Sequence, residues 1–304
     1  MDYGKVIEKI YSDIIKERIY GNVANYIPAL AEIDPSCYAI DVETLGGNNY
    51  HIGNYNVPFS IQSISKVFTL SMVISQIGDK LWERVGREPS GTPFNSLVQL
   101  EKEGGIPRNP LINAGALVVT DKLMDCYSNP KEAILNFVRS VCGNNKISFN
   151  DNVAKSEYKN ADRNRALAYF MKSFGNIRND VDHLIDIYCH QCSIEMTTQD
   201  LARSFLYLTN HGYNPFNKSQ LLTKSQSKRL GALMLTCGFY DESGDYAFKV
   251  GAPGKSGVGG GAVAYIPGNL SIAVWSPPLN IHGNSIRGIE TLERFTTDIG
   301  NSIF

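Results

Sequence analysis

Ser63 and Lys66 are the residues of this chain whose types and spacing best suit covalent chemistry. They open an apolar stretch with helical periodicity, and positions i and i+3 of a helix share one face, so the hydroxyl and the amine can touch. Ser65 is rotated from Lys66 by about 100° and is a poor partner. Burial can keep a lysine neutral, and a neutral amine can activate a serine as a nucleophile. Unpaired backbone N–H groups at a helix start also suit an oxyanion.

The triplet Lys255-Ser256-Gly257, near the other end of the chain, is a second motif found in enzymes with a serine nucleophile. S-x-x-K patterns recur by chance, and a solvated pair would account for Ser63 and Lys66 on their own. Lys255-Ser256-Gly257, however, begins between two predicted strands, and such a triplet on a strand is typical of serine enzymes of the penicillin-binding and β-lactamase class. If that strand lies beside the nucleophile, the N–H group of Val258 can supply half of an oxyanion hole.

Nucleotide and metal sites do not fit the spacing of the glycines, histidines and cysteines. A Walker A loop needs a glycine where Lys249 stands, and a dinucleotide-binding match at Gly257 runs into a strand instead of a helix. The five histidines show no H-E-x-x-H spacing. Cys189 and Cys192 form a lone C-x-x-C pair, whereas a structural zinc would need a second pair of ligands. We therefore expect neither a nucleotide site nor a metal site.

The composition indicates a globular protein that acts on a small molecule. The chain is 43% hydrophobic, and 29 basic against 30 acidic side chains give a net charge of -1, which favours neither nucleic acid nor a membrane surface as a partner. The apolar stretches are shorter than the roughly 20 residues needed to cross a bilayer. The first residues carry no apolar leader and the six cysteines are scattered, so we expect a cytoplasmic protein with reduced thiols.

The elements that must position these residues follow from hydrophobic periodicity. Alternation with period two predicts five strands, which could form one antiparallel sheet, at 38–43, 50–53, 246–250, 261–266 and 271–275. Helical periodicity predicts helices at 2–18, 63–78, 114–127, 164–173, 181–190, 197–210, 222–237 and 284–299. We expect an α/β (α+β) fold in which the first and last helices cover one sheet face. We also expect a single domain in which a helical subdomain, about 63–239, is inserted into a sheet subdomain of about 1–62 and 240–304.

Nearly the whole chain resembles one family, the serine-dependent glutaminases, which share the β-lactamase-like fold. The resemblance is carried by six blocks in order. They are Tyr26-Ile27-Pro28-Ala29-Leu30, Pro58-Phe59-Ser60-Ile61-Gln62-Ser63-Ile64-Ser65-Lys66, Asn109-Pro110-Leu111-Ile112-Asn113-Ala114-Gly115-Ala116, Cys192-Ser193-Ile194-Glu195, Lys255-Ser256-Gly257-Val258 and Trp275-Ser276-Pro277-Pro278-Leu279.

The resemblance implies roles for individual residues. It makes Ser63 the nucleophile, Lys66 its base, and Tyr240 a hydroxyl near the reacting centre that relays a proton to the departing ammonia. A second set would bind the substrate together with Ser63 and Tyr240. That set is Asn113, Glu157, Asn164, Tyr188 and the main chain of Val258, with Tyr26 as a further pocket tyrosine.

The substrate implied is L-glutamine, which would be hydrolysed to L-glutamate and ammonia through a glutamyl ester, without a metal or organic cofactor. A carboxylate such as Glu157 suits the ammonium of the substrate, and neutral donors such as Asn113 and Asn164 suit its carboxylate. Glu157 and Asn164 are also seven residues apart, two helical turns, and could instead form a solvated face. The resemblance further implies a homo-oligomer, a dimer or a tetramer.

Two other functions fit the same fold. One is a serine enzyme directed at β-lactams or D-peptides, for which Tyr158-Lys159-Asn160 imitates a Y-x-N element. That function would place Tyr158, rather than Glu157, in the site. The other is a binding protein without activity, although Ser63, Lys66 and Lys255 are all intact.

Overall fold

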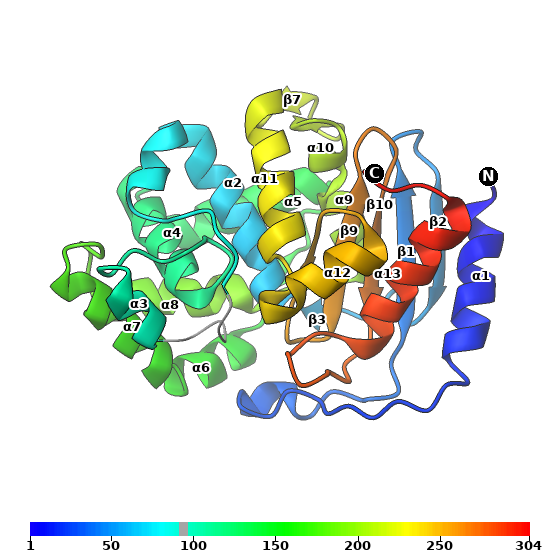
Figure 1. Ribbon diagram of the computed structural model, residues 1–304, viewed down its shortest axis with the longest axis horizontal. Helices are drawn as coiled ribbons and strands as arrows, with labels where there is room; N and C mark the ends of the chain where they lie inside the picture. The colour runs from blue at the N-terminus through cyan, green and yellow to red at the C-terminus, as the bar shows by residue number, and fades with distance from the viewer. Residues whose placement is uncertain (91–96) are drawn as a thin grey trace.

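A five-stranded antiparallel sheet forms one end of the molecule, as the computed structural model in Figure 1 shows. The structure describes residues 1–90 and 97–304. The strand order is β2-β1-β10-β9-β8, so β1, from the start of the chain, pairs with β10, from its end, and β2 forms one edge of the sheet. The strands are β1 (Ala39–Thr44), β2 (Asn49–Gly53), β8 (Gly254–Ser256), β9 (Gly261–Ile266) and β10 (Leu270–Trp275).

The two faces of the sheet contact different parts of the chain, because alternate side chains of a strand point to opposite faces. Ile40 and Val274 belong to a core that includes buried residues of α1 (Tyr3–Ile14) and α13 (Ile286–Ile299). Val263 and Trp275 belong to a larger core that the helical part of the chain builds. In Figure 1, α1 and α13 lie beside the sheet at one end of the molecule.

The helices between β3 and β8 form the rest of the molecule. They are α2 (Ser65–Ile77), η3 (Gly78–Glu83), α3 (Leu97–Lys102), α4 (Asn113–Cys126), α5 (Pro130–Cys142), α6 (Asp151–Lys159), α7 (Asp162–Ser173), α8 (Val181–Cys192), α9 (Thr198–Ser204), α10 (Leu206–Thr209), α11 (Lys224–Cys237), η4 (Tyr240–Glu242) and α12 (Ser243–Val250). In Figure 1, α9 and α12 also lie close to the sheet, and α3, α4, α6, α7 and α8 lie at the other end of the molecule. No helix in the described ranges is long and apolar enough to cross a bilayer.

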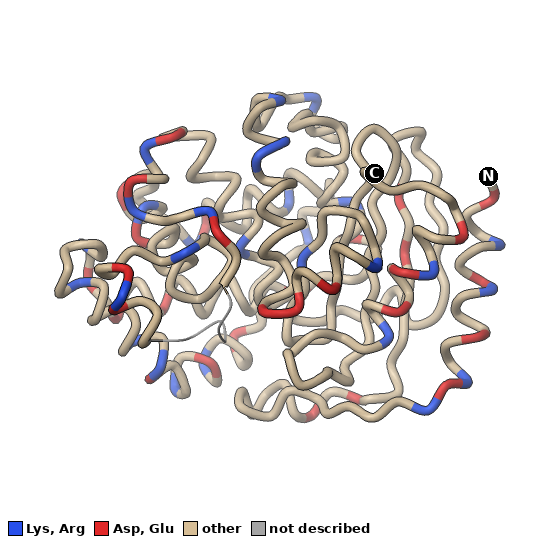
Figure 2. Tube along the Cα trace, viewed as in Figure 1, with Lys and Arg blue, Asp and Glu red and all other residues tan. Residues whose placement is uncertain are grey.

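Short strands connect these helices. β3 (Phe59–Ser60), β5 (Ile194–Met196) and β4 (Ser148–Phe149) form a small sheet, and β6 (Tyr213–Asn214) pairs with β7 (Ser219–Gln220). A 3-10 turn, η1 (Pro28–Leu30), precedes the main sheet. Basic and acidic side chains are interspersed along the trace, in keeping with the net charge of -1 (Figure 2).

The strand predicted at 246–250 is wrong. These residues end α12, and the fifth strand of the sheet is β8, which contains Lys255. Tyr246 and Val250 are both buried and lie one helical turn apart, whereas Phe248 between them is 88% exposed. Burial with a spacing of four marks a helix, and Gly251, with φ 61°, ends it.

Other helices differ from the prediction in their bounds or were missed. The helix predicted at 197–210 is divided at Phe205 into α9 and α10. No helix was predicted for α5 or α6. The signals for α5 are local: Asn129 caps its first turn, Pro130 occupies the first helical position, and Gly143 follows its end with φ 68°.

Candidate active site

A pocket of about 290 Å³ brings together residues from both ends and the middle of the chain. Its size suits a small ligand such as an amino acid. Eight residues predicted for the site line it: Tyr26, Ser63, Asn113, Glu157, Asn164, Tyr188, Tyr240 and Val258. Lys66 lies next to this lining and is hydrogen-bonded to Asn113.

Ser63 lies in a short 3-10 turn, η2 (Gln62–Ile64), immediately before α2. Gln62 has a φ of 50°, a left-handed conformation that is uncommon for a residue with a side chain and that often marks functional sites. Two hydrogen bonds connect the start of this turn to the end of α8, because Ser60 Oγ donates to Cys192 O at 2.9 Å and Gln62 Nε2 donates to Ser60 Oγ at 2.9 Å. The backbone therefore presents the hydroxyl of Ser63 to the pocket.

Lys66 is almost completely buried, at 1% exposed. Burial lowers the pKa of its amine to about 8, which brings the neutral form within reach at ordinary pH. Its Nζ donates to Asn113 Oδ1 at 2.7 Å and to Leu111 O at 3.4 Å. Within the described part of the chain, the amine makes no hydrogen bond to Ser63. Ser63 precedes the first turn of α2, so the pair does not have the geometry of positions i and i+3 in a regular α-helix.

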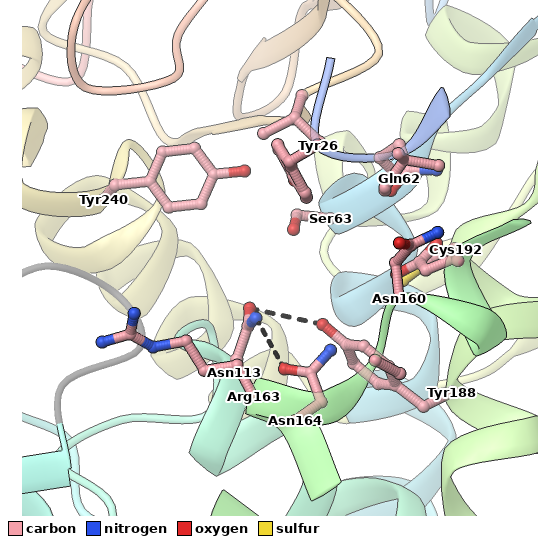
Figure 3. A pocket seen from close by; sticks show the side chains of 14 residues that line it. Tyr26, Gln62, Ser63, Asn113, Asn160, Arg163, Asn164, Tyr188, Cys192 and Tyr240 are labelled. Atoms are coloured by element: carbon pink, nitrogen blue, oxygen red, sulfur yellow. Dashed lines mark hydrogen bonds between the residues drawn. The ribbon is translucent and has the colours of Figure 1, made fainter. Parts of the chain in front are cut away.

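Asn113, the first residue of α4, connects the buried amine to the pocket wall. Its Oδ1 accepts hydrogen bonds from Lys66 at 2.7 Å and from the hydroxyl of Tyr188 at 3.3 Å. Its Nδ2 donates to Asn164 Oδ1 at 3.0 Å. Figure 3 shows Asn113, Asn164 and Tyr188 as one hydrogen-bonded group below Ser63. The predicted substrate-binding residues of α4, α7 and α8 are thus held in fixed relative positions.

Glu157 projects from α6 into the pocket and is buried. Burial raises the pKa of its carboxyl to about 7, an effect opposed by Gln62, Cys192 and the amine of Lys66. Its Oε2 accepts no hydrogen bond from the described residues. A buried carboxylate oxygen without a donor is costly unless a cationic ligand provides one.

Tyr240 and Val258 form the opposite wall. The ring of Tyr240 reaches across the pocket with its hydroxyl toward Ser63 (Figure 3). Burial raises the pKa of this phenol to about 12, an effect opposed first by hydrogen bonding with Ser63. Val258 lies between Gly257 and Gly259. A Cβ atom on either glycine would collide with the carbonyl oxygen of Ile61 or Ser60, so only glycine lets this segment lie against the nucleophile turn.

Tyr158, which a β-lactam-directed enzyme would place in the site, lies elsewhere. Its ring is 4.4 Å from Cζ of Arg165, and Glu157 takes the position in the pocket lining. Several lining residues were not predicted from the sequence: Ile27, Gln62, Asn160, Ala161, Arg163 and Cys192. Gln62 and Cys192 stand inside two of the sequence blocks that carry the family resemblance. Asn160 follows Glu157 by three positions, the spacing of neighbours on one helix face.

Comparisons with known proteins agree on one family. The sequence model described as "Glutaminase" matches residues 21–304. A glutaminase of Aliarcobacter butzleri is 50% identical over 305 residues, covering 100% of both chains. A solved structure of a probable glutaminase aligns with a TM-score of 0.94 and 34% identity, over 99% of this chain and 97% of the other. The structure of Mglu in its Tris and glutamate form aligns with a TM-score of 0.90 and 31% identity, over 100% of this chain and 67% of that one.

Proposed function

Because the chain belongs to the glutaminase family, whose members hydrolyse an amide bond, we propose that it converts L-glutamine to L-glutamate and ammonia through a Ser63 ester, with Lys66 as the base. Its solved relatives are glutaminases of the β-lactamase-like fold. One of them has a glutamate form. A glutamate-sized ligand is consistent with the pocket of about 290 Å³ around Ser63.

The observation that carries the proposal is the position of the buried Lys66 amine. It donates a hydrogen bond to Asn113, and Asn113 and Ser63 both line the same pocket. A lysine acts as a general base only while it is neutral, and a pKa of about 8 makes that form available. The two groups are not hydrogen-bonded to each other. Catalytic hydrogen bonds often tighten only when substrate binds, and we propose that glutamine brings Ser63 and Lys66 into contact.

We propose that the pocket recognises the two charged groups of glutamine with a carboxylate at one end and neutral polar groups at the other. Glu157 would bind the α-ammonium of glutamine, since its Oε2 is buried without a donor from the described residues. Asn113, Asn164 and Tyr188 would bind the α-carboxylate with neutral donors. In this binding mode the side-chain amide of glutamine would point toward Ser63 and Tyr240.

The reaction would proceed in two stages. Lys66 takes the hydroxyl proton of Ser63, and Oγ attacks the amide carbon while the N–H groups of Ser63 and Val258 hold the oxyanion. The carbon–nitrogen bond then breaks as the nitrogen receives the proton through Tyr240, and ammonia leaves. A water molecule gives a proton to Lys66 and attacks the ester, which releases glutamate and returns the proton to Ser63.

Mass spectrometry of the quenched enzyme tests the covalent step. The protein is mixed with glutamine, stopped in acid within one turnover, digested and analysed for a glutamyl group. The proposal expects the adduct on the peptide that contains Ser63, and its loss in Ser63→Ala. An adduct on any other residue would assign the nucleophile elsewhere.

Location and assembly are further parts of the proposal. All six cysteines are free, as expected for the reducing cytoplasm. We propose a homo-oligomer, a dimer or a tetramer. Tyr169 in α7 is 54% exposed and Phe174, the residue that follows this helix, is 49% exposed, and aromatic side chains are enriched in protein interfaces. Light scattering coupled to size exclusion measures the assembled mass.

A further inference from the structure

A buried lysine that the proposed reaction does not use lies directly behind Tyr240. Lys255 is 0% exposed, in the middle of β8. Its Nζ donates to Gly238 O at 2.8 Å and to Ser256 O at 2.6 Å. The same nitrogen lies 4.4 Å from the centre of the Tyr240 ring. Because a buried amine is unfavourable unless its hydrogen bonds are satisfied, its two carbonyl acceptors are essential to this position.

The backbone of Tyr240 has a conformation that must be enforced by its surroundings. Its φ is 56°, in the left-handed region that a bulky residue rarely occupies. Such a conformation persists where neighbouring contacts over-determine it, and it is found most often at functional sites. A relaxed backbone at this residue would turn the ring and move its hydroxyl away from Ser63.

Hydrogen bonds hold the chain on both sides of Tyr240. Lys255 holds the carbonyl of Gly238, two residues before it. Asn284 Nδ2 donates to Phe239 O at 3.2 Å, and Ser243 Oγ donates to the carbonyl of Tyr240 itself at 2.9 Å. Of the three residues that make these hydrogen bonds, Lys255 is the one whose side-chain nitrogen also lies over the ring of Tyr240.

We propose that Lys255 is a positioning residue, which holds the Gly238 carbonyl and the Tyr240 ring so that the phenol hydroxyl faces Ser63. This inference rests on the role proposed above for Tyr240. Burial, followed by the charge of Lys66, lowers the pKa of Lys255 well below its usual value. The inference therefore depends on the N–H donors of the side chain, which the neutral amine retains, rather than on a positive charge.

Lys255→Met is the first test, because methionine fills similar space without a donor. We expect kcat for glutamine hydrolysis to fall by about 10- to 100-fold, since a small misplacement of a catalytic group has effects of this size. KM should stay within about twofold, because Lys255 is not in the pocket lining. Lys249→Met is the matched control. Lys249 is exposed and paired with Asp245 on α12, and its loss should leave kcat unchanged.

A double-mutant cycle with Tyr240→Phe separates positioning from other effects. Phenylalanine keeps the ring and removes the hydroxyl, so Lys255 should then have little left to position. In the Tyr240→Phe background, Lys255→Met should lower kcat by less than about threefold. An undiminished loss in that background would contradict the inference, while the role of Tyr240 would stand. A fully active Tyr240→Phe would instead remove the proposed role of Tyr240, and the inference with it.

Circular dichroism and thermal unfolding establish whether each variant is folded. If Lys255→Met does not fold, Lys255→Gln takes its place in the cycle, because its amide keeps a donor for the Gly238 carbonyl. Its effect on kcat should likewise be smaller in the Tyr240→Phe background than in the enzyme that keeps Tyr240. Failure of both Lys255 variants to fold, with Tyr240→Phe folded, would assign Lys255 to the stability of β8 alone and overturn the inference.

Discussion

Burial changes the proton affinity of three groups around Ser63. It lowers the pKa of Lys66 to about 8, raises that of Glu157 to about 7, and raises that of Tyr240 to about 12. Near neutral pH a minor fraction of the Lys66 amine is neutral and able to accept a proton, and that fraction grows toward pH 8, while the phenol of Tyr240 keeps its proton. The carboxyl is poised to ionise when an ammonium binds. The shifts of Lys66 and Tyr240 suit their proposed roles, whereas the shift of Glu157 favours the neutral carboxyl until a cation binds beside it.

The pH dependence of kcat/KM follows from two of these groups. Lys66 must lose its proton to act as a base, and Glu157 must be ionised to bind an ammonium. Both conditions fail as the pH falls, so kcat/KM should rise with pH and reach half of its plateau near pH 8, where Lys66 titrates. A profile of kcat/KM measured with glutamine from about pH 6 to 10 checks this. A value that falls across this range would exclude a neutral Lys66 as the base.

Glu157→Gln should act mainly on substrate binding. The amide has nearly the same shape and keeps an acceptor, but it loses the negative charge that faces the substrate ammonium. Because a hydrogen bond to a charged group contributes about 1.5–3 kcal/mol, KM for glutamine should rise by about tenfold or more. Glu8→Gln, on the exposed side of α1, is the control for a change of one charge. An unchanged KM would place Glu157 outside the binding site.

At the scale of elements, local periodicity predicted most of the fold and failed where a segment was short. The turn at Gly268, with φ 78°, and the alternation of β9 and β10 are evident in the sequence. The segment 246–250 was misassigned because five residues can fit either period, and only the exposure of Phe248 separates them. β8 has three residues, too few for a periodic signal, and is recognisable by its Lys-Ser-Gly motif alone.

The nucleophile turn shows what a single sequence could not reveal about the site. The pairing of Ser63 with Lys66 assumed a regular helix, and the sequence holds no sign that Gln62 adopts a left-handed φ of 50°. Tertiary contacts surround that turn, among them the hydrogen bond from Ser60 to Cys192 O, and they involve residues far apart in the sequence. The assembly of the pocket likewise depends on long-range packing that only the folded chain displays.

The close approach of the Gly257–Gly259 segment to the nucleophile turn leads to a prediction. Gly259→Ala places a Cβ against the carbonyl of Ser60, so the segment must move and carry the N–H of Val258 away from Ser63. We expect kcat/KM to fall by about 100-fold. The matched control is Gly244→Ala in α12, where a Cβ meets nothing within 4 Å. It should keep full activity and gain about 0.5–1 kcal/mol of unfolding free energy. Equal activities for the two variants would contradict the proposed role of this segment.

At the scale of the whole molecule, the sheet separates two cores and the pocket draws on both sides of the chain. Tyr240 and Val258 come from the C-terminal part, whereas Asn113, Glu157 and Tyr188 come from the helices in between. The division into a sheet subdomain, 1–62 and 240–304, and an inserted helical subdomain, 63–239, stays a proposal. A site built from both parts requires the complete fold before any activity appears.

A buried acidic pair on β1 makes the stability of the whole molecule depend on pH. Asp41 is completely buried, and burial together with the charge of Glu43 raises the pKa of its carboxyl to about 8. A folded-state pKa above the unfolded value of about 3.9 means that the folded protein binds the extra proton. The stabilisation from that proton is fully present at low pH and is lost as the pH rises through about 8.

Asp41→Asn should flatten this dependence, because the amide cannot ionise. Its unfolding free energy at pH 9 should exceed that of the unsubstituted protein by on the order of a few kcal/mol, with a smaller difference at pH 6. Urea unfolding at both pH values measures the effect, and Asp13→Asn, an exposed aspartate of α1, is the control. A pH dependence that survives Asp41→Asn unchanged would assign it to other groups.

Ammonia release by Ser63→Ala is the most direct test of the central claim that Ser63 is the nucleophile. The neighbouring Ser65→Ala provides the comparison. Ser65 is buried, its Oγ donates a hydrogen bond to Gln62 O at 2.7 Å, and it does not line the pocket. With both variants folded by circular dichroism, we expect no measurable ammonia from glutamine with Ser63→Ala, and activity within about tenfold of the unsubstituted enzyme with Ser65→Ala. Full activity of Ser63→Ala would contradict the proposed mechanism.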